Sequence, residues 1–246
     1  MRRERARALI IGVGGLGCPA ALALAHAGIG ILGLCDDDVV DRTNLHRQIL
    51  FSDADVGTPK LDAAARALRR IASERTSGLQ VRLHPARLLP ENALALVREY
   101  DVVLEGSDNF ATKFLAADAC SIAGVPVVHA SAIRWIGTAL AVGPRGRPCY
   151  RCLFEDLPHE DTPNCAEAGV IGPVVGVVAA AQVDLALAML DGSTPPVEGQ
   201  LVTFDGKADR LRRRTIERRG GCALCGSAAS IRHIEPEAYV GPACAG

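Results

Sequence analysis

The chain has 246 residues, of which 49% are hydrophobic, 22% charged and 4% aromatic, a length and composition that fit one large α/β domain with a sizeable core. Its formal net charge is −1, so we expect no nucleic-acid partner and no general attraction to an anionic membrane. The low aromatic content also argues against stacking platforms for single-stranded nucleic acid.

The chain begins with a short polar segment that runs directly into an apolar stretch. A signal peptide needs a longer apolar stretch followed by a cleavage site, and neither is found here. The sequence therefore predicts a cytoplasmic protein.

Alternating apolar runs and helical patterns fill the first 130 residues. Residues 8–13 and 29–35 are short apolar runs typical of buried parallel strands, and the Ala- and Leu-rich stretch between them predicts a helix ending near Ala27. The alternation continues with predicted helices over 59–72, 90–97 and 110–123, and predicted strands over 79–84, 101–105 and 125–129. We therefore predict an α/β fold with a Rossmann-like, doubly wound and mainly parallel sheet.

The pattern changes in the second half of the chain. Antiparallel, exposed strands are predicted over 133–142, 200–204 and 209–215, with a long loop over 153–172. The stretch 170–190 is almost entirely apolar, but Gly172-Pro173 interrupts it and two polar residues lie inside it, so a buried helix from about residue 174 is favoured over a membrane span. The whole chain, 1–246, is predicted to be one domain, with a nucleotide-binding half over 1–130, a second half over 131–226 and a tail over 227–246 of unassigned role.

A glycine-rich motif follows the first predicted strand and opens the first predicted helix. Its glycines are Gly12, Gly14, Gly15 and Gly17. Glycines at such a position permit a tight turn and let backbone N–H groups approach phosphates at the helix N-terminus. Asp36, at the end of the second predicted strand, has the spacing of an acid that binds a ribose hydroxyl. The combination predicts nucleotide binding, and a tight structural turn is the alternative.

A dense polar set follows the second predicted strand and resumes at the start of the next helices. Its members are Asp36, Asp38, Asn44, Arg47, Gln48, Lys60, Asp108 and Asn109. Cations stabilise the charge on phosphates, and a carboxylate can hold a magnesium ion, so Arg47, Lys60 and Asp108 together favour ATP with Mg²⁺. Singly, each would be interpreted as a solvated surface charge. The glycine motif alone would suggest a nicotinamide cofactor.

Four of the nine cysteines form two Cys-x-x-Cys pairs. The pairs are Cys149 with Cys152 and Cys222 with Cys225. Four thiolates make a closed tetrahedral Zn²⁺ site of the structural kind. The alternative is a pair of redox dithiols, which usually sit at the start of a helix, whereas these cysteines lie among turn residues.

Seven segments, in chain order, carry a resemblance to a known family. They read GVGGLG, DDDVVDRTNLHRQILF, VGTPK, EGSDNFATK, PCYRCLF, NCAEAGVIGPVVGVVAAAQ and CALC. Over residues 8–226 the chain resembles the MoeB/ThiF family, the bacterial relatives of ubiquitin-activating enzymes. The resemblance implies an ATP-dependent adenylyltransferase. Its substrate would be the C-terminal Gly-Gly carboxylate of a small β-grasp sulfur-carrier or ubiquitin-like protein, activated as an acyl-adenylate with release of pyrophosphate.

The resemblance also implies roles for individual residues. Gly14 and its neighbours would back the nucleotide, Asp36 would hold the ribose and Asp108 the magnesium. Phosphate contacts are implied for Asn44, Arg47 and Lys60, with Gln48 in the same motif. A homodimer is implied, as is a carrier-binding second half with a crossover loop over 153–172. Cys165 in that loop is a candidate thiol that acts after adenylation, with simple packing as its alternative.

Two features depart from the family's pattern. Only seven residues precede the first predicted strand, so the arginine-bearing N-terminal arm that completes a neighbour's site is missing. The arginine after the Asp-Asn motif is replaced by Lys113, which loses the guanidinium's fork geometry.

No rhodanese-like extension follows the second cysteine pair, so a separate sulfurtransferase is expected. The remaining alternatives are an NAD-dependent oxidoreductase and a non-catalytic nucleotide-binding ThiF-like module.

Overall fold

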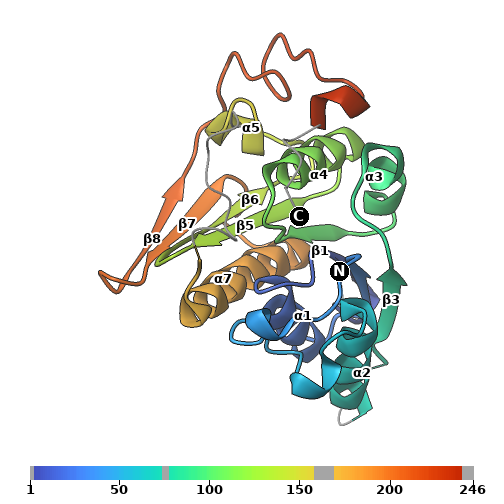
Figure 1. The fold of residues 1–246 in the computed structure, drawn as a ribbon. Coiled ribbons are helices and arrows are strands. Elements are labelled where there is room, and N and C mark those ends of the chain that lie inside the picture. The colour runs from blue at the N-terminus through green and yellow to red at the C-terminus, as the bar shows by residue number, and fades with distance from the viewer. Residues whose placement is uncertain (1–2, 74–77, 158–168, 240–246) are drawn as a thin grey trace.

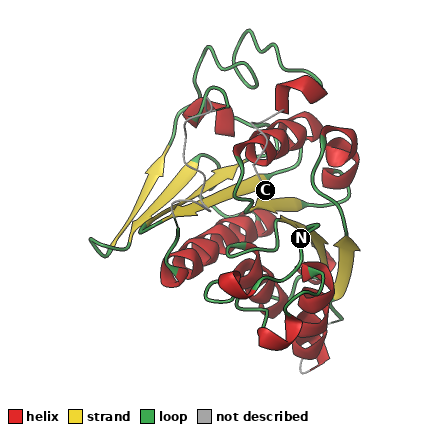
Figure 2. Ribbon diagram, viewed as in Figure 1, coloured by secondary structure: helices red, strands yellow, loops and turns green. Residues whose placement is uncertain are grey.

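The computed structural model describes residues 3–73, 78–157 and 169–239. Eight strands form one sheet in the order β3-β2-β1-β4-β5-β6-β7-β8 (Figures 1 and 2). The strands are β1 (Arg7–Ile11), β2 (Ile31–Cys35), β3 (Gln80–His84), β4 (Val102–Glu105), β5 (Val127–Ile133), β6 (Ile136–Val142), β7 (Gln200–Asp205) and β8 (Arg210–Thr215). The first five run parallel, and β6, β7 and β8 each pair antiparallel with the strand before them.

Helices cover both faces of this sheet. They are α1 (Gly17–His26), α2 (Lys60–Ser73), α3 (Pro90–Val97), α4 (Phe110–Ala123), the one-turn α5 (Tyr150–Leu153) and α7 (Gly172–Asp191). The apolar sides of α1, α2 and α7 share one core cluster, and those of α3 and α4 share another on the opposite face (Figure 1). The predicted fold class is therefore confirmed: an α/β sheet, mainly parallel, continued by antiparallel strands.

The order of the strands sets the place of the site. Strand β1 pairs in parallel with β2 on one side and with β4 on the other, so the connections leaving β1 and β4 diverge at their carboxyl ends. Ligands of doubly wound sheets bind at such a switch point. The glycine motif follows β1 and the Asp108 motif follows β4, which brings both predicted segments to this point.

The prediction of exposed strands after residue 130 is wrong for β6. Five of its seven residues are buried, because β5 and β7 pair on its two sides and helices cover both of its faces. The prediction holds for β8, where all six residues are exposed at the edge of the sheet. Strand β5 is also longer than predicted and runs on to Ile133, where it turns into β6.

Helix α7 agrees with the interpretation as a core helix. Within the described ranges it is the one helix long and apolar enough to cross a membrane by length and composition. It packs against β4, β5 and β6. The side chain of Gln182 is buried and donates to the backbone carbonyls of Glu105, at 2.9 Å, and Val128, at 2.8 Å. Pro173 begins the helix rather than breaking it, because the first turn needs no N–H donor from that residue.

The tail after the second cysteine pair packs onto the sheet's helices. Residues Pro236–Tyr239 form a short 3₁₀ helix that contacts α3 and α4. The buried Tyr239 hydroxyl donates to the Asp118 carboxylate at 2.7 Å, and Arg151 from α5 donates to the same carboxylate. A buried ion pair therefore ties the tail, α4 and the first cysteine pair together.

Candidate functional site

The glycine turn after β1 packs directly on the turn after β4. Gly12 has a φ of +85°, and a Cβ built there would lie 3.2 Å from the backbone N and Cα of Ser107. A Cβ on Gly17 would collide with the carbonyl oxygen of Gly12. Glycine is therefore required at both positions, once for the left-handed backbone and once for the close approach of the helix to the turn.

The same turn presents free backbone donors. Counting only residues that the structure describes, the N–H groups of Gly14 and Gly15 have no hydrogen-bond acceptor. They precede the N-terminus of α1, where unsatisfied N–H groups favour an anion. A Cβ on Gly14 would meet only the Gln48 amide nitrogen, at 3.9 Å, so there is open space beside it. This turn fits a phosphate group.

Asp36 is locked between the glycine turn and the end of β2. One carboxylate oxygen accepts from the Val13 N–H at 2.7 Å, and the other accepts from the Asp38 N–H at 2.9 Å. Burial raises the pKa of Asp36, and the positive charge of Lys60 opposes that rise. A fixed carboxylate at this position is suited to accept hydrogen bonds from ribose hydroxyls, as the spacing of the motif predicts.

Lys60 is buried, so it is not the solvated surface charge that its residue type alone would suggest. It starts α2, is 6% exposed, and its ammonium lies 2.7 Å from an Asp38 oxygen and 3.8 Å from an Asp36 oxygen. Asp38 is itself half exposed, so it can exchange this partner for solvent more readily than Asp36 can. The cation is thus held in place before any phosphate arrives.

Arg47 and Gln48 lie over the glycine turn. A Cβ on Gly15 would be 3.2 Å from the Cδ of Arg47, so the arginine stem rests on that glycine. Gln48 is 3% exposed, and its side-chain oxygen is buried without a hydrogen-bond partner among the described residues. A buried polar atom left unpaired is costly, which indicates a polar group that arrives with a ligand.

The turn after β4 places Asp108 on the surface and Asn109 at the N-cap of α4. Asp108 is exposed, whereas the Asn109 side-chain oxygen accepts from the Thr112 N–H at 2.8 Å and so caps α4. Only the amide nitrogen of Asn109 is left to meet a nucleotide. Asn44 ends a 3₁₀ turn after β2, and its backbone N–H donates to the Asp41 carbonyl.

Sequence reasoning missed a buried charged group beneath this turn. It consists of Glu105 at the end of β4, Lys113 on α4 and His129 on β5, all almost fully buried. In the family's pattern, an arginine of the site stands where this chain has Lys113. Here the Lys113 ammonium lies inside the protein, 2.9 Å from a Glu105 carboxylate oxygen. The available signal was the position of each charge within an otherwise apolar strand or helix pattern.

The four predicted metal ligands converge. The sulfur atoms of Cys149 and Cys222 are 3.4 Å apart, those of Cys152 and Cys225 are 3.3 Å apart, and all four lie within 4.8 Å of one another. A tetrahedral Zn²⁺ with bonds of about 2.3 Å would place its sulfurs about 3.8 Å apart. The cluster therefore fits the predicted zinc.

The four thiols affect one another's ionisation. Burial and the neighbouring thiols raise the pKa of Cys149. At Cys222 burial acts in the same direction, but N–H donors from Cys225 and Leu224 outweigh it and lower the pKa to about 7. One prediction needs correction, because Cys149 precedes the one-turn helix α5 and Cys152 lies inside it. The convergence of the second pair, rather than a lack of helix, is what favours metal over redox chemistry.

Cys165 lies outside the described residues, as does much of the predicted crossover loop. The end of that loop is described. There the Arg134 N–H donates to the Gly169 carbonyl at 2.8 Å, and the Ile171 N–H donates to the Arg134 carbonyl at 3.1 Å. The loop thus returns to the sheet beside the β5–β6 turn.

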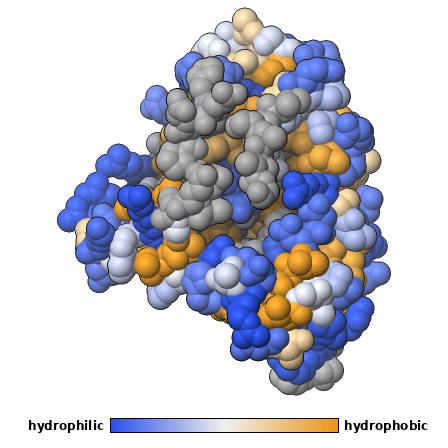
Figure 3. All heavy atoms as spheres, in the orientation of Figure 1, coloured by the Kyte–Doolittle hydropathy of each residue, from blue (hydrophilic) through white to orange (hydrophobic). Residues whose placement is uncertain are grey.

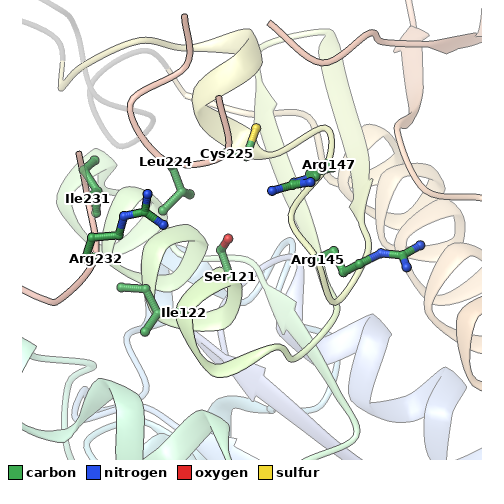
Figure 4. Close-up of a pocket in the computed structure, with 8 residues that line it drawn as sticks. All are labelled: Ser121, Ile122, Arg145, Arg147, Leu224, Cys225, Ile231 and Arg232. Atoms are coloured by element: carbon green, nitrogen blue, oxygen red, sulfur yellow. The ribbon is translucent and has the colours of Figure 1, made fainter. Parts of the chain in front are cut away.

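A cavity of about 280 Å³ lies beside the cysteine cluster (Figure 4). Its lining includes Ser121, Arg147, Cys225 and Arg232, and the Arg147 and Arg232 side chains point toward it whereas Arg145 points away. None of the predicted nucleotide residues lines this cavity. The predicted nucleotide residues instead gather at the ends of β1, β2 and β4.

Comparison with known proteins assigns the chain to a family. The model of the ThiF family matches residues 2–224. The chain belongs to the ThiF family. Similar relatives include the protein named adenylyltransferase and sulfurtransferase MOCS3 of Mus musculus, 42% identical over 98% of this chain, and its namesake of Anopheles gambiae, 38% identical over 98%. This ThiF family chain covers 52% and 54% of those two relatives, about half of their length.

Solved structures support the same fold for this ThiF family chain. E. coli MccB solved with ATP superposes with a TM-score of 0.76 at 24% identity, covering 91% of this chain and 68% of MccB. PaaA superposes with a TM-score of 0.72 at 22% identity, covering 89% of this chain and 66% of PaaA. At this level of identity the likeness extends to the fold.

Proposed function

We propose that this chain is an ATP-dependent adenylyltransferase that activates the C-terminal Gly-Gly carboxylate of a small β-grasp sulfur-carrier or ubiquitin-like protein. The observation that carries the proposal is the glycine turn at the β1/β4 switch point, which places free N–H donors beside the stem of Arg47 and the amide nitrogen of Gln48, whose buried oxygen is unpaired among the described residues. Lys60 adds a second cation nearby. An NAD-dependent oxidoreductase has no comparable need for these cations.

The reaction needs positioning and charge stabilisation rather than a general base. The carrier's carboxylate is already ionised when it attacks the α-phosphate, and pyrophosphate leaves. Arg47 and Lys60 stabilise the negative charge that develops on the phosphates, and the N–H groups of the glycine turn orient them. Asp108 would hold the magnesium ion, which supplies further charge neutralisation when bound. Asp36 would fix the ribose, and Asn44 and the Asn109 amide would contact the nucleotide.

We assign the carrier-binding surface to the antiparallel end of the sheet. Three large apolar side chains are exposed there: Trp135 at 39%, Ile136 at 41% and Leu211 at 47%. Ile136 lies on β6 and Leu211 on β8, with β7 between them, and the register puts their side chains on opposite faces of the sheet. Every residue of β8 is exposed, and hydrophilic side chains gather over this arm of the molecule (Figure 3). The exposed, arginine-rich edge strand β8 suits a carrier with an acidic rim.

Further parts of the proposal rest on the family and on the names of its members. We propose that the cysteine cluster holds one structural Zn²⁺, that the protein is a homodimer, and that it acts in the cytoplasm, where free thiols persist. The MOCS3 relatives are named as both adenylyltransferase and sulfurtransferase. We propose that a separate sulfurtransferase supplies sulfur to the adenylated carrier, and that Cys165 is a candidate thiol acting at that later stage.

Pyrophosphate exchange into ATP tests the proposal. We expect the wild-type protein to catalyse exchange only in the presence of a carrier that ends in Gly-Gly. Arg47→Ala and Asp108→Asn should each slow exchange by about 10²–10³-fold, because each removes one preorganised charge, while the unfolding temperature stays near wild type. Lys60→Ala should slow exchange and also destabilise the fold, because it leaves Asp36 buried without its cation.

The outcomes separate the alternatives. Exchange at the wild-type rate in an Arg47→Ala/Lys60→Ala variant would exclude these roles. Nucleotide binding with no exchange, for any Gly-Gly carrier tried, would favour the non-catalytic module, and binding of NAD in preference to ATP would favour the oxidoreductase. In the same assay Cys165→Ala should retain exchange. If it also retains a thiol-sensitive adduct with the carrier, Cys165 is not the acting thiol.

A further inference from the structure

A buried carboxylate lies directly under the turn that carries Asp108, and the nucleotide chemistry does not use it. Glu105 ends β4, and its side chain is fully buried. One carboxylate oxygen accepts from the Ser107 N–H at 2.7 Å and from the Ser107 hydroxyl at 2.5 Å. The other accepts from the Lys113 ammonium at 2.9 Å and from the His129 Nδ1 at 3.2 Å. Each oxygen of this carboxylate therefore has two donors.

This group stays ionised inside the protein. Burial alone would raise the pKa of Glu105, but the Lys113 cation and the His129 and Ser107 donors lower it to about 2. Burial lowers the pKa of His129, so the ring is neutral near pH 7 and donates through Nδ1. A buried ion pair often adds little net stability compared with apolar packing. This ion pair instead fixes the positions of the groups that it joins.

The geometry that Glu105 fixes is that of the Asp108 turn. Ser107 is held from below by its two hydrogen bonds to Glu105 and from the side by Gly12, where a Cβ would lie only 3.2 Å from the Ser107 backbone. On the other side of Asp108, Asn109 is anchored because it caps α4. Asp108 thus projects from a backbone segment that is fastened at both neighbouring residues.

Glu105 is anchored to three neighbouring elements of the core. The Lys113 ammonium, on α4, also donates to the Ala130 carbonyl on β5 at 2.6 Å. Gln182, on α7, donates to the Glu105 backbone carbonyl at 2.9 Å. A shift of Glu105 with the Ser107 turn would therefore break contacts with α4, β5 and α7 together.

We propose that Glu105 is a positioning residue that, with Lys113 and His129, sets where Asp108 presents its carboxylate to the magnesium ion of the bound nucleotide. The inference rests on the proposed function, because it takes Asp108 as the magnesium ligand. Groups that orient a metal ligand through its supporting hydrogen bonds typically change metal affinity or activity by about 10–100-fold when they are removed.

Glu105→Gln is the central variant, since it keeps the shape and removes the charge. We expect the Mg²⁺ concentration for half-maximal exchange to rise by about 10-fold or more. We also expect calorimetry to show weaker binding of ATP with Mg²⁺ and unchanged binding of ATP without it. Lys113→Met should also raise the Mg²⁺ concentration for half-maximal exchange. Lys113→Arg should leave it close to the wild-type value, because the cation is kept.

A double-mutant cycle with Asp108→Asn separates positioning from a general loss of structure. If Glu105 acts through Asp108, the Glu105→Gln change adds little to the magnesium requirement of the Asp108→Asn protein. Asp118→Asn is the matched control, because Asp118 is an equally buried carboxylate on α4 that pairs with Arg151 away from the site. It should lower the unfolding temperature without changing the magnesium requirement.

Two results would overturn the inference: a folded Glu105→Gln protein with the wild-type magnesium requirement, or full additivity with Asp108→Asn. If Glu105→Gln does not fold, Ser107→Ala removes one donor from the same carboxylate and should raise the requirement in the same direction. Failure of the proposed function looks different. The wild type would then support no exchange, while calorimetric binding of ATP with Mg²⁺ would still report on Glu105.

Discussion

His129 gives the folded protein a pH dependence that its sequence position alone would not suggest. It is 3% exposed, and burial lowers its pKa below the usual 6.5 in spite of the hydrogen bond to Glu105. Below about pH 6.5 the unfolded chain therefore binds a proton that the folded chain refuses. The free energy of unfolding therefore keeps its full value above that pH. As the pH drops below it, the free energy of unfolding decreases by up to about 1.4 kcal/mol per pH unit for one proton. Burial shifts the pKa of His84 in the same direction.

We predict that His129→Gln flattens this dependence. Urea unfolding at about pH 5, 6 and 7, a range that spans the usual histidine pKa, should show a free energy of unfolding that rises with pH in the wild type and rises less in the variant. The exposed His233 provides a control, and His233→Gln should keep the wild-type slope. An unchanged slope in His129→Gln would mean that folding does not lower the pKa of His129.

At the scale of single residues, the sequence predicts the site where a motif fixes backbone geometry or spacing. Gly12 and Asp36 lie where the glycine motif places them, and the four cysteines converge as their pairing predicts. The buried state of Lys60 and Lys113 could not be predicted. It depends on Asp36 and Asp38 for one and on Glu105 and β5 for the other, contacts that only folding brings about.

Among the elements, the cysteine cluster is the one whose stability should depend on metal. It joins α5 to the segment after β8, so we expect one zinc per chain by elemental analysis. Cys152→Ser or chelation should destabilise the second half of the protein, since structural zinc supplies about 10–16 kcal/mol of apparent binding energy in small motifs. Cys35→Ala is the control, because Cys35 is buried outside the cluster and bonds the Ala86 carbonyl. Metal-free protein with four readily alkylated thiols would contradict this.

Element bounds follow from local pattern, whereas the burial of an element follows from its neighbours. Helices α3 and α4 have the predicted bounds because Pro90 and the Asn109 cap mark their starts and Gly124 ends α4. The sequence analysis predicts an exposed strand over 133–142, the stretch that contains β6. The strand is internal because β7, about 60 residues later in the chain, pairs with its outer edge. Such long-range pairing leaves no trace within the strand itself.

The whole molecule leaves several large aliphatic side chains exposed on the segment between β2 and α2. Ile49 is 58% exposed, Val39 54% and Val56 38%. We predict that a second copy covers this segment, so light scattering at micromolar concentration should give twice the 25.8 kDa chain mass. Ile49→Asp should shift the mass toward the monomer, and Leu89→Asp, at an exposed position on a different segment, should not. A monomeric wild type would contradict the prediction.

The two pairs of the cysteine cluster are synthesised at different times as the chain grows. Each cysteine of the first pair meets a partner 73 residues later. At a synthesis rate of about 5–20 residues per second, the second pair follows the first by about 4–15 s. The strands of the nucleotide half are all made before then. At that stage a ribosome-bound chain carries only half of the cysteine cluster, while the predicted nucleotide-binding half already has all of its sequence.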